Sequence, residues 1–438
     1  MPTTVRRYVP EQSLLLPPSP RDWLAEGHLA YFLSDTVDAL DLKAFYEPYE
    51  GDGRRNSPYD PRMMVKLLLY GYATGVFSSR KIAKKLQEDV AFRVLAGENF
   101  PAHRTIAEFR QRHLLSFQGL FVQVIEVARE AGLLRMGTVA VDGTKVKASA
   151  SKRKAMSYGR MKQEKDRLKA DIVELTSRAA RVDAQEDAQY GPDNTGDEIP
   201  EELKRREQRL GKIQEAIERL RSRQAAEDQA AGRKAVPACA EEGKTKRDFG
   251  EPPEKKQDNF TDPESRIMKT SSGFEQCYNG QLAVESESRL ILAAKITQSG
   301  ADHDELLPVL EETHTNVGKF PQAVLADAGY RSEENLQKLE ASRIDAYVAL
   351  GREGKKAKVT NEDRHPATQR MRQKLETEEG RKRYSKRKSI VEPVNGWIKS
   401  VLGFRQFSLR GLTKVSGEWT LVCLALNLRQ MRPLLQAM

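Results

Sequence analysis

Hydrophobic patterns of several kinds follow one another along the chain. Up to about residue 135, apolar residues recur at three-and-four spacing, which predicts short helices. Asp60-Pro61 is a typical helix start, because Asp accepts hydrogen bonds from free amides and Pro fits the first helical position. Around 138–148 and 280–297 the pattern becomes β-like. The apolar stretch GEWTLVCLALNLRQM near the C-terminus predicts a buried helix.

Breaks between these patterns predict a domain division. We expect a helical domain over 1–135 and an α/β domain built from 136–155 and 263–438. Charged helical repeats over 156–230, interrupted by GPDNTGDEIP, predict a helical hairpin or coiled coil that protrudes as an insertion. Residues 231–262 are rich in Lys, Glu, Pro and Gly, which predicts a flexible linker. Residues 352–388 are basic and poor in large apolar groups, so we expect this segment to lie at the surface or to form a loop.

Two aspartates follow short apolar runs. TVAV precedes Asp142, and AVLA precedes Asp327. In an open α/β sheet, ligands bind just outside the carboxyl ends of the strands, which is where this pattern places Asp327. Asp142 is expected in or at the end of a strand, because Val146 and Ala148 continue the β-like alternation. Each Asp also has an ordinary interpretation. Asp142-Gly143 is a strong hairpin-turn signal, and Asp327 could cap the next helix.

A third carboxylate, Glu392, lies in the helical pattern SIVEPVNGWIKSVLGF, seven residues before Lys399. Carboxylates in apolar sequence are costly to bury unless they are paired or bind a cation. Hard oxygen ligands suit Mg²⁺ or Mn²⁺, and two such ions can stabilise the attacking and leaving oxygens of a phosphodiester displacement. The acidic group His303-Asp304-Glu305 could supply a further ligand, although acids also favour a helix N-terminus for dipole reasons.

Composition narrows the class of protein. The 438 residues carry a formal net charge of +10, which favours a polyanionic partner, nucleic acid first. Three dispersed cysteines argue against a disulfide framework and a structural zinc site. Six scattered histidines form no Ser/His or Cys/His arrangement of the kind that nucleophilic catalysis needs. The N-terminus lacks the apolar core of a signal peptide, and we expect no membrane span and a cytoplasmic location.

The N-terminal segment SRKIAKKLQED contains Arg80 and Lys84 beside apolar positions. Short helices with clustered basic residues are compatible with a helix-turn-helix-like DNA-binding unit. They are equally compatible with an ordinary helical domain that has a solvated basic face.

In order, the chain contains VAVDGTKVKA, SRIMKTSSGFEQCYNGQLAVE, LADAGY and RYSKRKSIVEPVNGWIKSVLGFRQFSLRG. With LLLYGYATGVFSSRKIAKKL, these words resemble the DDE transposases of bacterial insertion sequences, in the group that has a helical N-terminal transposase domain. The resemblance implies an RNase H-like catalytic domain in which Asp142, Asp327 and Glu392 form a metal-binding catalytic triad.

The resemblance also implies DNA contacts. The family's tyrosine-arginine-glutamate-lysine signature matches Tyr384, Glu392 and Lys399. Arg387 lies five residues before the glutamate instead of four, where Lys388 stands, so the arginine position stays open between the two. Arg405, in the last of the matching words, is a further expected contact. Lys399 is expected near the scissile phosphate, and a solvated helix lysine is its ordinary interpretation.

The expected activity is cleavage at the element's terminal inverted repeats followed by attack of the released 3′-OH on target DNA. Two Mg²⁺ or Mn²⁺ ions, held by Asp142 with Asp327 and by Asp142 with Glu392, would activate water and steady the leaving oxygen, without a covalent intermediate. A nucleoid-associated homodimer on paired ends is expected. Alternatives are a catalytically inactive DNA-binding protein, against which the three acids speak, and a domesticated nuclease or recombinase of the same fold.

Overall fold

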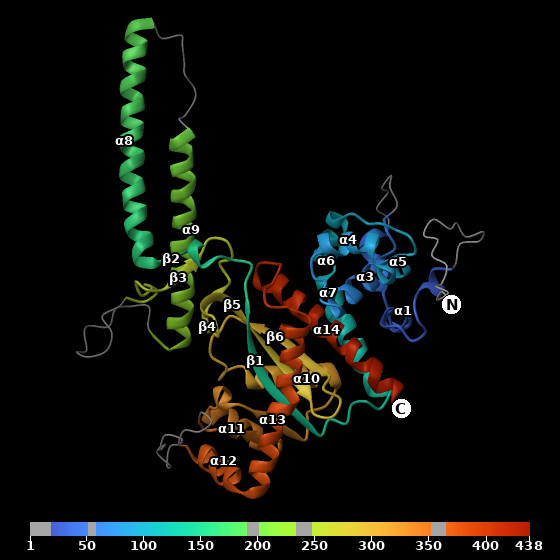
Figure 1. Cartoon of the computed structure of the whole chain (residues 1–438). Helices are drawn as coiled ribbons and strands as arrows, with labels where there is room; N and C mark the ends of the chain where they lie inside the picture. The colour runs from blue at the N-terminus through green and yellow to red at the C-terminus, as the bar shows by residue number, and fades with distance from the viewer. Residues whose placement is uncertain (1–18, 51–57, 191–200, 234–247, 352–364) are drawn as a thin grey trace, which may run out of the picture.

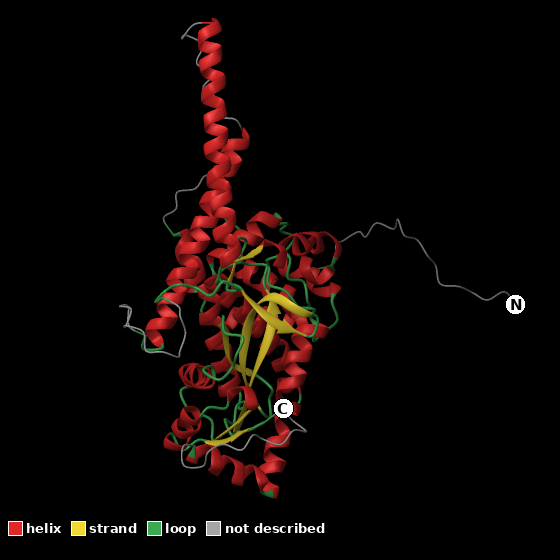
Figure 2. Ribbon diagram, turned by 90° about the vertical axis from the view of Figure 1, so that its left-hand side faces the viewer, coloured by secondary structure: helices red, strands yellow, loops and turns green. Residues whose placement is uncertain are grey.

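A computed structural model describes residues 19–50, 58–190, 201–233, 248–351 and 365–438. It has a helical N-terminal region, a mixed sheet surrounded by helices, and two long helices that project away from both (Figures 1 and 2). Among the residues described, no helix is both long enough and apolar enough to cross a membrane. The coarse prediction, an α/β protein with a helical N-terminal region, is confirmed.

The N-terminal region consists of helices only. Asp60 begins one of them as expected, because its Oδ1 accepts a hydrogen bond from the Arg62 amide at 2.7 Å and Pro61 occupies the first turn. The elements of this region are η1 (Pro20–Trp23), α1 (Leu29–Ala39), α2 (Lys43–Tyr46), η2 (Glu47–Tyr49), α3 (Pro61–Ala73), α4 (Ser79–Glu88), α5 (Val90–Ala96), α6 (His103–Arg112) and α7 (Leu114–Glu130).

The main sheet has a long central strand that pairs on both edges. β5 (Gly273–Glu285) pairs antiparallel with β1 (Thr138–Lys147) on one edge. Its other edge pairs antiparallel with β4 (Arg266–Thr270) and β6 (Ile291–Thr297). Beyond β1 the sheet continues with two parallel strands, β7 (Ala323–Ala326) and then β8 (Asp345–Val348). The β-like stretch 280–297 thus forms an antiparallel hairpin of β5 and β6.

β1 runs straight through Asp142-Gly143, so the hairpin-turn interpretation of this dipeptide is wrong. Asp142 pairs with Leu282 and Gly143 pairs with Gln281 in β5. Long-range pairing with β5 outweighs the local turn preference. Glycine is required here for space: a Cβ at Gly143 would lie 2.7 Å from Gln281 Nε2.

Helices cover the sheet and fill the space between it and the N-terminal region. α13 (Glu378–Gly396) packs on β1, β5, β7 and β8, whereas α14 (Leu412–Gln436) packs against β6 as well as α3 and α7. The long run of fully buried side chains in α14 confirms the predicted buried helix. Three further helices follow β6 along the chain: α10 (Leu306–Val317), α11 (Glu333–Ala341) and α12 (Pro366–Glu376).

For residues 352–388 we expected surface or loop; over 365–388 the surface alternative is confirmed and the loop alternative is wrong. Residues 352–364 lie outside the described residues, but α12 and the first half of α13 fill the rest. Thr377 caps α13, accepting a hydrogen bond from the Gly380 amide at 2.9 Å. Lys, Arg and Glu are good helix formers, so a helix with a narrow apolar side can look like loop in composition.

Two long helices, α8 (Tyr158–Tyr190) and α9 (Glu201–Ala230), pack side by side where the helical hairpin was expected (Figure 1). Their base joins a small sheet of β2 (Ala155–Ser157) and β3 (Gln257–Asn259). The predicted linker therefore does not extend to 262. Asp258 in β3 is fully buried and pairs with Arg219 and Arg223 of α9, which fixes this segment. Residues 234–247 lie outside the described residues.

Candidate active site

Asp142 and Asp327 lie side by side because of the parallel pairing of β1 with β7. Val141 pairs with Ala326, so each aspartate follows one member of the same residue pair. Asp327 ends its strand, and its Oδ1 accepts a hydrogen bond from the Gly329 amide at 2.8 Å. This bond caps the short helix η4 (Ala328–Tyr330). The capping interpretation of Asp327 is thus correct, but it engages one oxygen and leaves the other available.

Asp142 lies in an enclosed environment under α13. Its Oδ2 accepts a hydrogen bond from Asn395 Nδ2 at 3.0 Å, and its Oδ1 is 3.6 Å from the Arg387 guanidinium. Burial raises the pKa of Asp142 to about 6. Arg387 lowers this pKa, whereas the nearby negative charges of Asp327 and Asp302 raise it. A carboxylate that burial and like charges destabilise is favourable for cation binding.

Arg387 is the basic residue of α13 whose guanidinium pairs with Asp142. Its side chain is 11% exposed beside Asp142, whereas Lys388 lies on the exposed side of α13. Tyr384, one turn earlier, is partly buried and hydrogen-bonds to Arg387. The structure therefore gives the two basic residues different environments, which the sequence left open.

Lys399 lies in the π-helical turn Trp397–Val401 that follows α13. Its Nζ donates a hydrogen bond to the backbone oxygen of Lys145 in β1 at 2.9 Å. Burial lowers the pKa of Lys399. The solvated-lysine interpretation is wrong for this residue, because its amine is held against the strand that carries Asp142.

Glu392 is exposed on α13. Asn395, less than one turn further along, is the residue that bonds to Asp142. Across the described part of the chain, no three His, Cys, Asp or Glu side chains come close enough together to hold a metal ion. The structure thus brings Asp142 and Asp327 together and leaves Glu392 outside this pair.

Sequence reasoning missed Asp302, in the loop between β6 and α10. Its Oδ1 accepts hydrogen bonds from Asn279 Nδ2 at 2.6 Å and Gln281 Nε2 at 2.8 Å, and Lys145 Nζ lies 3.2 Å away. A signal was present, because Asn279 and Gln281 are polar residues that alternate within the buried part of β5. In the neighbouring group His303-Asp304-Glu305, the Asp304 side chain is 78% exposed.

The expected DNA contacts outside the sheet lie on exposed surfaces. Arg80 and Lys84 project from α4, whose opposite side is buried through Ile82 and Leu86. Lys84 pairs with Glu88 at 3.4 Å. Arg405 is also exposed. Figure 1 shows α4 in a part of the molecule separate from β1 and α13, so contacts by α4 and by the aspartate site would involve different parts of a DNA molecule.

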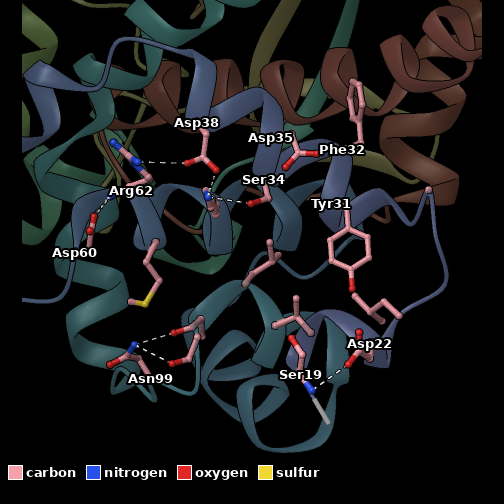
Figure 3. A pocket seen from close by; sticks show the side chains of 18 of the residues that line it. Ser19, Asp22, Tyr31, Phe32, Ser34, Asp35, Asp38, Asp60, Arg62 and Asn99 are labelled. Carbon is pink, nitrogen blue, oxygen red and sulfur yellow. Dashed lines mark hydrogen bonds and ion pairs between the residues drawn. The ribbon is translucent and has the colours of Figure 1, made fainter.

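A cavity of about 1650 Å³ in the N-terminal region is the main competing location for a site. Figure 3 shows acidic side chains from α1 and the start of α3 around it. Two of these acids have partners: Asp38 pairs with Lys66 at 2.7 Å, and Asp60 accepts hydrogen bonds from Tyr46 and the Arg62 amide. A paired acid at the surface is not destabilised in the way that burial and like charges destabilise Asp142. A cation would therefore gain less by binding in this cavity than beside Asp142.

The donor set at the sheet fits a divalent cation. Asp142 and Asp327 supply carboxylate oxygens, the ligands that Mg²⁺ and Mn²⁺ prefer. Burial and the repulsion of neighbouring carboxylates raise the pKa of Asp142, and a bound cation would offset both effects. In the structure the Arg387 guanidinium, 3.6 Å from its Oδ1, balances the charge of Asp142.

Comparisons with known protein families give two matches. A model described as Transposase DDE domain matches residues 252–428, and one described as Transposase domain (DUF772) matches residues 18–112. The first match contains Asp302, Asp327 and Glu392, whereas Asp142 lies outside both. No curated protein and no solved structure matches the chain. Both transposase families occur in the order that the sequence words predicted, and the chain belongs to the DDE-type insertion-sequence transposases.

Proposed function

We propose that this transposase binds the ends of its element, cleaves DNA there and transfers the released 3′-OH to target DNA, with Asp142 and Asp327 as the central metal ligands. The observation that carries the proposal is the register of β1 and β7, which sets Asp142, within β1, beside Asp327 at the end of β7. A divalent ion bound there supplies a polarised water and charge stabilisation at the scissile phosphate.

The fold supports this proposal. The strand order β6-β5-β1-β7-β8, with three antiparallel strands followed by two parallel ones, is the arrangement expected of an RNase H-like domain. The Transposase DDE domain match covers four of these five strands. In such a domain the first strand carries the first carboxylate, which is the position of Asp142 in β1.

Residues of α13 complete the proposed site. Arg387 neutralises Asp142 in the absence of a cation, and it can turn to a DNA phosphate when Asp142 takes one. Lys399, held against β1, places a second positive charge beside the same phosphate. Glu392 is the proposed third ligand. Its side chain reaches the aspartates only if α13 shifts or rotates when DNA and cation bind, because it is exposed in the structure.

DNA binding by the helical region completes the proposal. The net charge of +10 favours a phosphate backbone, and Arg80 and Lys84 on α4 lie away from the aspartates. The proposed partners are the terminal repeats and target DNA, bound by two copies of the chain on paired ends.

The test is cleavage of a labelled duplex carrying the element's terminal repeat, in Mg²⁺ or Mn²⁺. Wild type should nick at the repeat boundary, and Asp327→Asn and Glu392→Gln should lose nicking while keeping repeat binding in a mobility-shift assay. Glu379→Gln is the matched control, because Glu379 is on the same helix, 71% exposed and paired with Arg383. It should cleave like wild type.

Three results would contradict the proposal in different ways. Cleavage that survives Glu392→Gln would remove Glu392 from the site. Loss of binding together with cleavage in Asp327→Asn would make Asp327 structural. Specific binding by wild type without cleavage in either metal would favour the inactive DNA-binding alternative.

A further inference from the structure

A buried polar network lies on the side of β1 opposite Asp142. Side chains alternate along a strand, so Gly143 and Lys145 face away from Asp142. Their partners in β5, Gln281 and Asn279, are fully buried. Buried amides are costly unless hydrogen-bonded. Both donate to Asp302 Oδ1, which makes this carboxylate the centre of the network.

The network touches the strand that carries Asp142. The position of a Cβ on Gly143 is 2.8 Å from Asp302 Oδ1, so the carboxylate packs directly on the backbone next to Asp142. Lys145, two residues further, is bound from both sides: its Nζ pairs with Asp302 at 3.2 Å, and its backbone oxygen accepts from Lys399. Asp302 therefore restrains the second half of β1.

The same network reaches Asp327 through Gln281. The Oε1 of Gln281 accepts a hydrogen bond from the Tyr330 hydroxyl, and Tyr330 ends the short helix that Asp327 caps. The Asn335 amide ties the loop to this turn, because its Nδ2 donates to the backbone oxygens of His303 at 2.6 Å and Tyr330 at 2.9 Å. The turn that orients Asp327 is thus fixed to the Asp302 loop.

We infer that Asp302 is a positioning residue of the carboxylate site: by accepting hydrogen bonds from Asn279, Gln281 and Lys145, it fixes the strand and the turn that orient Asp142 and Asp327. The inference rests on the proposed function, in which these two aspartates bind the cation. Residues that orient metal ligands act through geometry, and replacing them typically costs about 10- to 100-fold in metal affinity or activity.

Hydrogen-bond acceptance distinguishes this role from direct ligation. Asp302→Asn keeps one oxygen for the three donors, whereas Asp302→Ala leaves them without a partner. A positioning residue therefore tolerates Asn and not Ala, while a metal ligand tolerates neither. Asp304→Ala is the matched control, because Asp304 is in the same loop and 78% exposed.

Two measurements on the full-length chain test the inference. The first is Mn²⁺ affinity, from the electron paramagnetic resonance signal of free Mn²⁺ during titration. The expected result is binding at least about 10-fold weaker in Asp302→Ala, and near wild type in Asp302→Asn and Asp304→Ala. The second is hydrogen exchange without metal, in which amides of 326–332 and 141–147 should exchange faster in Asp302→Ala alone. Thermal unfolding verifies that each variant is folded at the working temperature.

The outcomes separate the inference from the proposed function. Equal losses of Mn²⁺ affinity in Asp302→Asn and Asp302→Ala would overturn the inference, because charge or ligation would then be the role of Asp302. Unchanged affinity and exchange in folded Asp302→Ala would overturn it as well. Absence of Mn²⁺ binding in wild type would instead refute the proposed metal site, and hydrogen exchange would still decide whether Asp302 fixes the two segments.

Discussion

The pKa of Asp142 leads to a specific prediction about stability. Burial raises this pKa from an ordinary value of 3.8 to about 6. The folded protein therefore binds an additional proton between these pH values, and stability from this group falls as pH rises through the same window. At 1.36 kcal/mol per pKa unit, the ionised carboxylate costs about 3 kcal/mol at neutral pH in the absence of a cation.

Asp142→Asn should remove this cost. Its amide oxygen can still accept from Asn395, and the neutral group needs no counter-charge. Without divalent metal at pH 8, we expect the free energy of unfolding to exceed that of wild type by about 3 kcal/mol. At pH 5 the gain should fall to about half, because wild-type Asp142 is then largely protonated in the folded state.

Urea denaturation in EDTA at both pH values measures this difference, and comparing variant with wild type cancels the other titrating groups. Asp304→Asn is the control and should show no pH-dependent difference, because Asp304 is 78% exposed. Mn²⁺ should stabilise wild type at pH 8 and leave Asp142→Asn unaffected. A variant less stable than wild type at pH 8 would refute the reasoning, because the Arg387 attraction would then outweigh burial.

Two further substitutions test how the site is supported. Glu418, fully buried in α14, accepts hydrogen bonds from the buried Leu409 amide and from the part-buried amide and hydroxyl of Ser408. Glu418→Ala leaves these donors without their acceptor and should lower the free energy of unfolding by about 3 kcal/mol, measured by urea denaturation. Glu418→Gln should cost less, and equal losses would contradict this account. Gly143→Ala should reduce cleavage per folded molecule, because the new Cβ would lie 2.7 Å from Gln281 Nε2. Gly137→Ala is the control: a Cβ there would have no heavy atom within 4 Å, so this variant should behave like wild type. Equal activity of the two glycine variants would refute the crowding argument.

Local sequence determined the elements that place the two aspartates. An apolar run that ends in Asp327 and is followed by Gly329 predicts a short buried strand and a tight turn, and both are present. The apolar run before Asp142 did the same for the start of β1. A carboxylate directly after an apolar run is a candidate ligand in an α/β sheet, so these two residues could be identified from pattern alone, although β1 continues past Asp142.

Only the tertiary structure decided which polar groups surround them. Asp142-Gly143 has a strong local turn preference, and pairing with β5, more than a hundred residues later, keeps it extended. The phase of α13 on the sheet put Arg387 against Asp142 and left Lys388 exposed, a choice that spacing could not make. Asp302 acquires its role through Gln281 and Asn279, which are distant in sequence. Side-chain hydrogen bonds between strands depend on register, and register is a property of the assembled sheet.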